Sequence, residues 1–434
     1  MRRVFKVLMW VALGPVALVL LIGAAWVASN GPWADAAPVP VPPELQAQPV
    51  TLAPADNAFF DAQGLLAPEG ETPNAWGQRS MARRAAAADA KLLTVPHGKD
   101  WECRSTQEDC VTRWRAAAAT LAAQMAQARL FGERCRAFAS RTGFQEPALV
   151  HVEAIPQFRP VTSCVRWLQV DAVLATDPQH ARQSWAQADA VLRLLASGTQ
   201  SLIGQAVTWA TAVRHQVLLA QWAAQRPAGE ALPAEWLAAW PARVLQPQVW
   251  MASESAYFRA TISTVSKAPI EAVAPESGNP QWWGWLGRLG YLPELTRQAS
   301  TAQWMADVRL FGHLEGPALA RAVRGKPEPS GSWWSYVSWR NSIGHLMLVV
   351  ARPMFDTYAL RQADLVLAQQ ALQASQQLNA VPAAERAGWW ARQPIDAGVR
   401  ERLSLEPGAL VVRTWQSETQ PNEAQPLRFP LRPA

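Results

Sequence analysis

Glu254 is the residue in this chain of 434 whose surroundings best suit acid–base chemistry. It lies in the segment Ala252–Phe258, within a stretch whose apolar spacing predicts a helix at about 247–266. A glutamic acid that protonates a leaving group near neutral pH needs a raised pKa, and an apolar pocket provides it. The alternative interpretation places Glu254 on a solvated helix face, where most glutamates of this kind lie.

The pair Glu254-Ser255 in a helix resembles the acid-bearing motif of soluble lytic transglycosylases. In that family one glutamic acid protonates the glycosidic oxygen, so the resemblance implies this role for Glu254. It covers only these few residues. The Gly-Leu-Met-Gln segment that follows the motif in the family is missing from this chain, which puts lytic activity in doubt.

Tryptophan is abundant, with 23 residues beside only four tyrosines. Two segments that contain glycine carry five candidate ligand-binding indoles: Trp282, Trp283, Trp285, Trp333 and Trp334. Indole faces in such loops can stack on sugars or enter a membrane interface. Core packing is the alternative, and it fits Trp114, Trp185 and Trp209, which occur at helical spacing.

The four cysteines lie within 62 residues, and an even, clustered set in an exported chain predicts two disulfides. Three pairings are possible. We favour Cys103 with Cys110, which closes a short polar loop, and therefore Cys135 with Cys164. Cys135 shares an inward face with Leu121, and Cys164 lies on the inner face of the next long helix. A four-cysteine zinc site is the rival, but no C-x-x-C spacing supports it.

Other signatures of catalysis and of cofactors are absent from the sequence. The six histidines include no H-E-x-x-H spacing, so no metal site is predicted. There is no G-x-S-x-G elbow and no phosphate-binding G-x-x-x-x-G-K-[ST] loop, so no cofactor is predicted. The net charge is +6, but the basic residues are scattered, which argues against nucleic-acid binding.

The amino terminus predicts a membrane segment. Arg2, Arg3 and Lys6 precede an uncharged apolar stretch, residues 7–28, that is long enough to cross a bilayer. The basic flank lies before it and the first charge after it is Asp35, so the positive-inside rule predicts a cytoplasmic amino terminus. The predicted location is therefore the bacterial inner membrane, single-pass, with the bulk of the chain in the periplasm.

Two fates of this segment compete. Ala34-Asp35-Ala36 has the small-x-small form of a cleavage site, but the apolar stretch is long for a cleaved signal, so we favour an uncleaved signal anchor, residues 1–30. Residues 31–54 contain seven prolines and predict a semi-rigid tether.

The remainder predicts a mainly α fold, a multi-helix bundle or irregular helical array over residues 55–395, with a possible subdivision near 268–293. Expected helices include 111–140, 180–196, 200–225, 233–243 and 335–379, the last one interrupted by Pro353. Residues 396–434 predict an extended tail with a small β-hairpin, formed by 409–415 and 427–431. The short apolar run 343–350 predicts a buried core helix.

Two stretches are similar to a group of uncharacterised proteobacterial proteins with one amino-terminal membrane segment. They begin at Asn57 (NAFF, then GLLAP) and at Asn341 (NSIG, then RQADL). The resemblance implies an envelope location and no activity. We therefore expect a membrane-anchored periplasmic scaffold or interaction protein with an envelope protein as partner. The alternative is a cell-wall glycan-binding or glycan-cleaving protein that uses Glu254 and the tryptophan loops.

Overall fold

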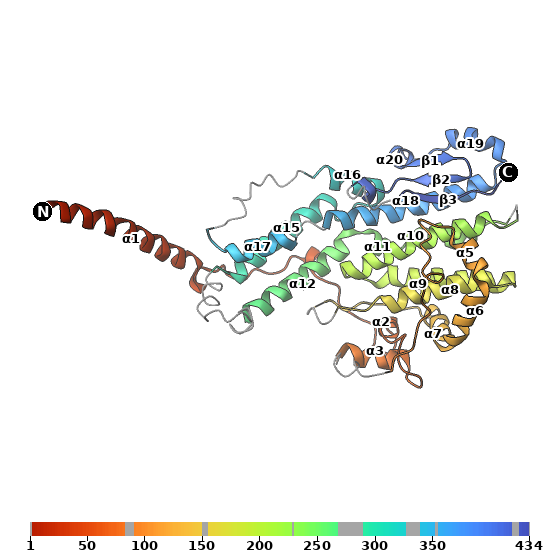
Figure 1. Ribbon diagram of the computed structural model, residues 1–434, viewed down its shortest axis with the longest axis horizontal. Helices are drawn as coiled ribbons and strands as arrows, with labels where there is room; N and C mark the ends of the chain where they lie inside the picture. Colours follow the sequence, from red (N-terminus) through yellow and green to blue (C-terminus); the bar gives the residue numbers. More distant parts are fainter. Residues whose placement is uncertain are drawn as a thin grey trace. The chain divides into compact units, whose positions relative to one another are not determined.

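The computed structural model describes residues 2–82, 91–149, 155–227, 230–267, 290–326, 339–351, 355–418 and 425–433. In these ranges the chain is mainly α-helical, with a small antiparallel sheet near its carboxyl end (Figure 1), which confirms the predicted fold class. The chain divides into two compact units. The smaller unit comprises Met1–Gln46, Ser255–Asp307 and Lys326–Phe355, and the larger unit comprises Ala47–Glu254, Val308–Gly325 and Asp356–Ala434.

The elements of the larger unit are α2 (Ala58–Gln63), α3 (Pro73–Ala82), α5 (Cys110–Ala116), α6 (Ala118–Gln127), α7 (Arg129–Ala139), α8 (Arg159–Leu174), α9 (Pro178–Gly198), α10 (Leu202–Ala224), η4 (Ala234–Leu237), α11 (Ala242–Leu245), α16 (Gly316–Arg324), η6 (Ala383–Glu385), α19 (Arg386–Arg392), α20 (Ala397–Arg400), β1 (Leu403–Glu406), β2 (Ala409–Val412), η7 (Gln416–Glu418) and β3 (Leu427–Pro430). Those of the smaller unit are α1 (Arg2–Asn30), η1 (Pro32–Ala34), η2 (Pro43–Leu45) and α17 (Ser342–Ala351). Helices α12 (Pro247–Lys267), α15 (Pro293–Phe311) and α18 (Phe355–Asn379) have residues in both units.

Helices α8, α9 and α10 form the centre of the larger unit. Asp177 caps the start of α9, because its carboxylate accepts hydrogen bonds from the backbone N–H groups of Gln179 and His180. Ser201 caps α10 in the same way. Helix α10, which covers most of the helix predicted at 200–225, packs against α5, α8, α9 and β3.

The helix predicted at 111–140 is three helices, α5, α6 and α7, with breaks at Ala117 and Ala128. A straight helix of that length would extend about 45 Å, whereas the 16 residues of α8 extend about 24 Å. Each break turns the chain back, so that all three segments pack against α8. The predicted inward positions Trp114, Leu121 and Cys135 are buried.

The prediction of one helix at 233–243 is wrong. Only a turn of 3-10 helix forms at Ala234–Leu237, and a second short helix begins at Ala242. The sequence places Pro241 directly after Trp240, and a residue that precedes proline is pushed out of the helical region. The proline therefore divides the segment.

The carboxyl-terminal sheet has three strands in the order β1-β2-β3, all antiparallel. The predicted pairing of β2 with β3 is confirmed, with Leu410 opposite Phe429. Strand β1 was not predicted. It pairs with β2 through a tight turn at Pro407-Gly408, where Gly408 has a φ of 78° that glycine adopts without strain. Helices α19 and α20 precede the sheet, so helical structure extends beyond residue 395.

In the smaller unit, the end of α1 is hydrogen-bonded to residues 339–341, which lie far from it in the sequence. The buried side chain of Asn30 donates to the carbonyl of Trp339 and accepts from the N–H of Asn341, at 2.9 and 2.7 Å. Asp35 caps α15, because its two carboxylate oxygens accept the N–H groups of Glu294 and Leu295, at 3.0 and 2.9 Å. Part of the predicted proline-rich tether therefore contacts the smaller unit.

Helix α17 ends at Ala351 and α18 begins at Phe355, and the predicted interruption near Pro353 lies outside the described residues. The expectation of a buried core helix at 343–350 is only half right. Leu348 is buried, but Leu346 and Val350 are 56% and 71% exposed. These two residues are four positions apart and lie on one exposed face of α17.

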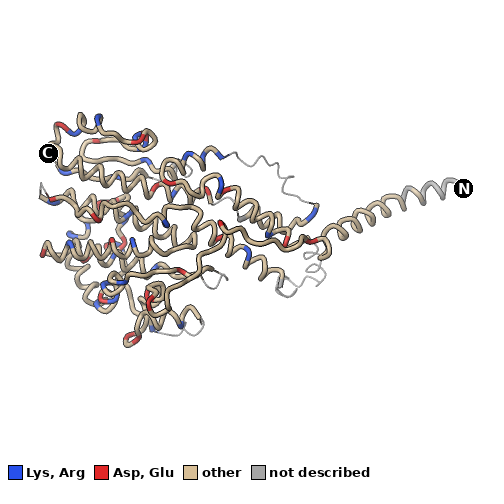
Figure 2. The backbone as a smooth tube through the Cα atoms, turned by 180° about the vertical axis from the view of Figure 1, so that it is seen from behind, with Lys and Arg blue, Asp and Glu red and all other residues tan. Residues whose placement is uncertain are grey.

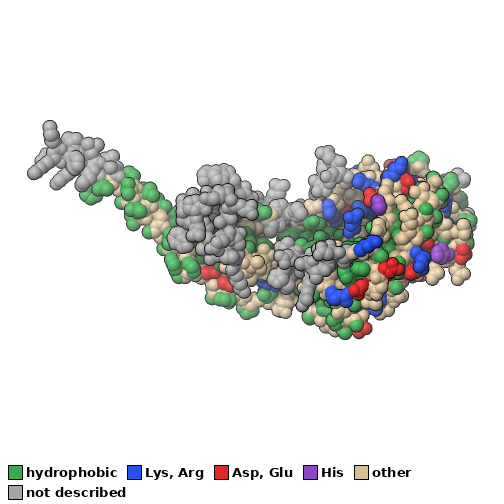
Figure 3. Space-filling model, turned by 60° about the horizontal axis from the view of Figure 1, so that its bottom comes forward, with side chains coloured by type: hydrophobic (Ala, Val, Ile, Leu, Met, Phe, Trp, Pro, Cys, Tyr) green, Lys and Arg blue, Asp and Glu red, His purple; other side chains and the backbone are tan. Residues whose placement is uncertain are grey.

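Charged residues are interspersed along the backbone of the larger unit, with acidic and basic residues on the same helices (Figure 2). The described part of α1 from Val7 onward carries none, and its apolar side chains are visible along the helix (Figure 3). Its 18 residues Leu13–Asn30 form a segment that is long and apolar enough to cross a membrane. A signal sequence near the amino terminus meets the same criterion.

Candidate functional site

Glu254, the candidate acid, lies on α12 beside the first turn of α10. Its Oε1 accepts a hydrogen bond from the backbone N–H of Leu202 at 3.0 Å. Burial raises its pKa to about 7, against the lowering effect of the Leu202 N–H, and the charge of Glu146 adds to the rise. Part of this carboxyl group's population is therefore protonated at neutral pH, as a general acid requires.

Glu146 is a second carboxylate at the same helix end, and its side chain is 1% exposed. Its Oε2 accepts the N–H groups of Gln200 and Ser201 at 2.8 and 2.9 Å, and its Oε1 accepts the Ser201 hydroxyl at 2.5 Å. Burial raises its pKa, while these hydrogen bonds and the charge of Arg243 lower it. The two carboxylates thus satisfy three backbone donors at the positive end of the α10 dipole.

Gly204 makes this arrangement possible. A Cβ atom there would lie 2.9 Å from Oε2 of Glu146 and 2.9 Å from Cζ of Phe158. No pattern in the sequence indicates Glu146, which lies in a loop between α7 and α8 and is 55 residues from Ser201. Only the Ser-x-x-Gly spacing at Ser201 and Gly204, directly before an apolar helix, indicates a helix start there.

A second buried polar group lies at the centre of the larger unit. His215 is 1% exposed, and its Nδ1 lies 3.0 Å from Nε2 of Gln169. Burial lowers the pKa of His215 to about 3, so this histidine is neutral at pH 7. Asp189 is 3.9 Å from its Nε2 and is bound to Arg193 at 2.6 Å. Since His215 is closed off from solvent, this group positions α8, α9 and α10 rather than meeting a substrate.

The five candidate tryptophans lie outside the described residues, so their role stays a prediction. They are Trp282, Trp283, Trp285, Trp333 and Trp334. The tryptophans expected in the core, Trp114, Trp185 and Trp209, are all buried.

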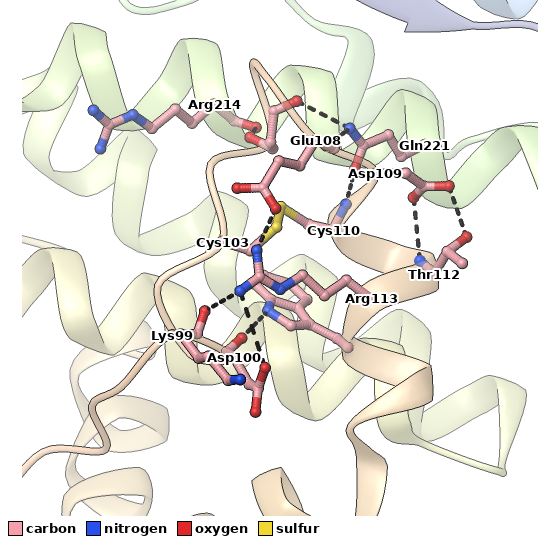
Figure 4. The surroundings of a disulfide bond; sticks show 12 residues. Lys99, Asp100, Cys103, Glu108, Asp109, Cys110, Thr112, Arg113, Arg214 and Gln221 are labelled. Atoms are coloured by element: carbon pink, nitrogen blue, oxygen red, sulfur yellow. Dashed lines mark hydrogen bonds and ion pairs between the residues drawn. A yellow bond between two sulfur atoms is a disulfide. The ribbon is translucent and has the colours of Figure 1, made fainter.

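Both favoured disulfides are present, Cys103–Cys110 and Cys135–Cys164. The first closes a loop that lies against α10 (Figure 4). Gln221 holds this loop, because its Oε1 accepts the N–H of Cys110 and its Nε2 donates to the carbonyls of Ser105 and Glu108, at 3.0, 2.9 and 2.8 Å. The Ser105 hydroxyl donates to the carbonyl of Arg214 at 2.9 Å.

A pocket of about 330 Å³ opens beside this loop, within the larger unit. Its walls come from four segments: the disulfide loop, α10, α18 and the carboxyl-terminal strands. A second pocket, of about 310 Å³, lies where α18 meets α19 and the segment before α20. Its lining includes the amides of Gln370, Gln373 and Gln377 and the indole of Trp390.

In the described part of the chain, no three His, Cys, Asp or Glu side chains gather as metal ligands would. The candidate groups are therefore the carboxylate pair at the start of α10 and the pocket beside the disulfide loop. No protein-family model, no curated protein and no solved structure matches this chain.

Proposed function

We propose that this protein is a single-pass interaction protein of the bacterial cell envelope, anchored in the inner membrane by α1 with its body in the periplasm. Arg2, Arg3 and Lys6 before the apolar segment and Asp35 after it support this orientation. The two disulfides support an oxidising compartment for the body.

The observation that carries the proposal is the hydrogen bonding of Asn30 and Asp35. Cleavage after Ala36 would remove Asn30 from Asn341 and Trp339, and it would remove the Asp35 cap from α15. The N–H of the buried Asn341 would lose its acceptor, which costs about 1–3 kcal/mol. The smaller unit therefore favours retention of α1 as an anchor.

Aromatic residues at the end of α1 further support a membrane position. Trp33 and Trp339 are 70% and 52% exposed. The Trp339 indole N–H donates to the Ser29 hydroxyl at 3.0 Å, and that of Trp33 to the carbonyl of Ala28 at 2.9 Å. Indoles fixed beside the last turn of a membrane helix occur at the level of the lipid head groups. The exposed Leu346 and Val350 of α17 belong to the same unit.

In-cell photo-crosslinking of the full-length chain tests the interaction role. A crosslinkable residue at Gln377 or at Gln393, both beside the second pocket, is compared with one at Arg129 on the exposed surface of α7. The proposal expects one dominant envelope protein from a pocket position and none from Arg129. Equal labelling from all three positions, or none from any, would contradict it.

A second candidate function is glycan cleavage with Glu254 as general acid. It is favoured by the pKa of about 7 at Glu254 and by a second carboxylate, Glu146, at the same helix end. Purified full-length protein is incubated with cell-wall sacculi beside Glu254→Gln. Release of soluble glycan by the wild type and not by Glu254→Gln supports this function, and no release by either excludes it.

A further inference from the structure

The pocket beside the disulfide loop combines positive charge with an apolar floor. Arg214 of α10 and Arg361 of α18 both line it. Neither guanidinium has a carboxylate within ion-pair distance among the described residues, and the buried Nε of Arg361 has no hydrogen-bond acceptor there. Buried donors in folded proteins are normally paired. These two side chains therefore offer unused donors to whatever enters the pocket.

Neighbouring arginines strengthen the positive field. Partial desolvation lowers the pKa of the exposed Arg214, and the charge of Arg104 lowers it further. Desolvation lowers the pKa of Arg166, and the charge of Arg214 lowers it further, while the charge of Glu102 raises it. Arginine remains protonated at neutral pH in every case. Arg214 is thus repelled by two neighbouring arginines and would be stabilised by an anion placed near it.

The acidic residue that lines the pocket does not neutralise this field. The carboxylate of Asp364 already accepts the N–H groups of Trp415 and Gln416, at 2.5 and 3.2 Å. Burial raises its pKa to about 7, against the lowering effects of these N–H groups and of Arg402 and Arg324. A large fraction of Asp364 is therefore uncharged at pH 7 and below.

The remaining walls define the rest of the ligand. Trp209, Val213 and Leu427 provide an apolar floor, and Thr106 and Gln107 form a polar rim on the disulfide loop. The Cys103–Cys110 bond and Gln221 fix that loop on α10, so the rim is preorganised. The volume of 330 Å³ lies at the small end of ligand pockets.

We propose that this pocket binds a small molecule that carries a carboxylate or phosphate group on an apolar body. Arg214 and Arg361 hold the oxyanion through charge-assisted hydrogen bonds, and the apolar body lies over Trp209. This site is independent of membrane attachment and of any protein partner, so it can fail while the proposed envelope role stands, and the reverse.

Calorimetric titration of the full-length, oxidised protein in detergent tests the site. The probes are benzoate, phenyl phosphate and, as a neutral control, benzyl alcohol. Ligands of this size bind with a Kd of about 1 mM or tighter when a site fits them. We expect one or both anions to bind and benzyl alcohol not to bind. Whichever anion binds more tightly identifies the group. Equal binding of benzyl alcohol, or no anion binding up to about 10 mM, would overturn the proposal.

Three variants locate the binding. Arg214→Gln and Arg361→Gln should each weaken it about tenfold or more, since each removes charge-assisted hydrogen bonds. Arg129→Gln, at a site on α7 that is 77% exposed, should leave it unchanged. Loss of binding in Arg129→Gln to the same extent, or unchanged binding in both pocket variants, would place the anion elsewhere and refute the site.

Ala210→Trp keeps the test decisive if an arginine variant does not fold. Ala210 lines the pocket from an exposed position on α10, so a bulky side chain there fills the pocket without removing a charge or a core contact. We expect it to abolish anion binding while the melting temperature stays close to that of the wild type. A folded Ala210→Trp protein that binds as well as the wild type contradicts the proposal.

Discussion

Asp364 on α18 fixes the carboxyl-terminal segment by accepting the backbone N–H of Trp415 at 2.5 Å, and its second oxygen accepts that of Gln416. Two cations lie close to the Trp415 ring, with the guanidinium carbons of Arg402 and Arg324 at 4.0 and 5.0 Å from its centroid. One buried acid thus anchors the segment that closes one wall of the anion pocket.

Replacing this acid should destabilise the larger unit. Asp364→Ala leaves two backbone donors without an acceptor, which we expect to cost about 2–4 kcal/mol in the free energy of unfolding. Asp364→Asn keeps one acceptor oxygen and should cost about half as much. Denaturant unfolding measures both. Asp396→Ala is the control, since it removes two similar bonds from an exposed cap, and should cost about 0.5–1 kcal/mol. A loss in Asp364→Ala no larger than in Asp396→Ala would refute the anchoring role.

The close packing of Glu146 and Phe158 around Gly204 predicts that a methyl group added at this position lowers the stability of the fold. Gly204→Ala places a Cβ at 2.9 Å from the Glu146 carboxylate and from the Phe158 ring, so we expect a loss of about 1–3 kcal/mol despite the better helix propensity of alanine. The matched control is Gly388→Ala in α19, where a Cβ would meet only Nη1 of Arg392 at 3.5 Å. That change should be neutral or stabilise the fold by up to about 1 kcal/mol. Similar effects of the two substitutions would contradict the close packing at Gly204.

The raised pKa of Glu254 predicts that the stability of the fold depends on pH. Its pKa rises from 4.5 to about 7 on folding, so its stabilising contribution is complete below pH 4.5 and is lost as the pH rises through 7. Glu254→Gln lacks this loss, because its amide oxygen still accepts the Leu202 N–H without a charge. We therefore expect the melting temperature of the variant relative to wild type to be higher at pH 8 than at pH 5. Glu133→Gln, on the surface of α7, should show no such difference. Parallel melting profiles for wild type and Glu254→Gln would contradict the raised pKa.

The disulfides should contribute unequally. The loop-entropy model gives about 3.5 kcal/mol for the loop of Cys135–Cys164 and about 2.5 kcal/mol for the shorter loop of Cys103–Cys110. We expect the double alanine variant of Cys135 and Cys164 to lose more stability in denaturant unfolding. The double alanine variant of Cys103 and Cys110 should lose less stability. It should weaken anion binding, however, because it frees the loop that carries Thr106 and Gln107. Unchanged binding in that variant would show that the loop does not preorganise the pocket.

Much of the fold follows from local signals in the sequence. Asp177-Pro178 gives the start of α9, and the cysteine positions give both disulfides because the inward faces of two helices bring Cys135 and Cys164 together. The breaks at Ala117 and Ala128 carry no such signal. They arise because the chain must stay on the short α8, which is a tertiary constraint.

The candidate sites were less predictable. Glu254 was found through its serine neighbours, but its observed role at the end of α10 depends on a contact across 52 residues. Glu146 has no helical or strand pattern around it. Arg214 lies on α10, whereas Arg361 and Asp364 lie on α18, which is far from α10 along the chain. The hydrogen bond of Gln216 to Gln369 at 2.6 Å joins these two helices, and the sequence does not indicate this contact.

Protease accessibility in intact spheroplasts tests the central claim, a membrane-anchored protein with its body outside the cytoplasm. The full-length chain carries a tag after Ala434, and a cytoplasmic protein serves as the internal control. We expect added protease to remove the tagged body while the control stays intact, and we expect the untreated chain to sediment with membranes at its full, uncleaved mass. A body that survives while the spheroplasts are intact and is digested only after lysis would contradict it.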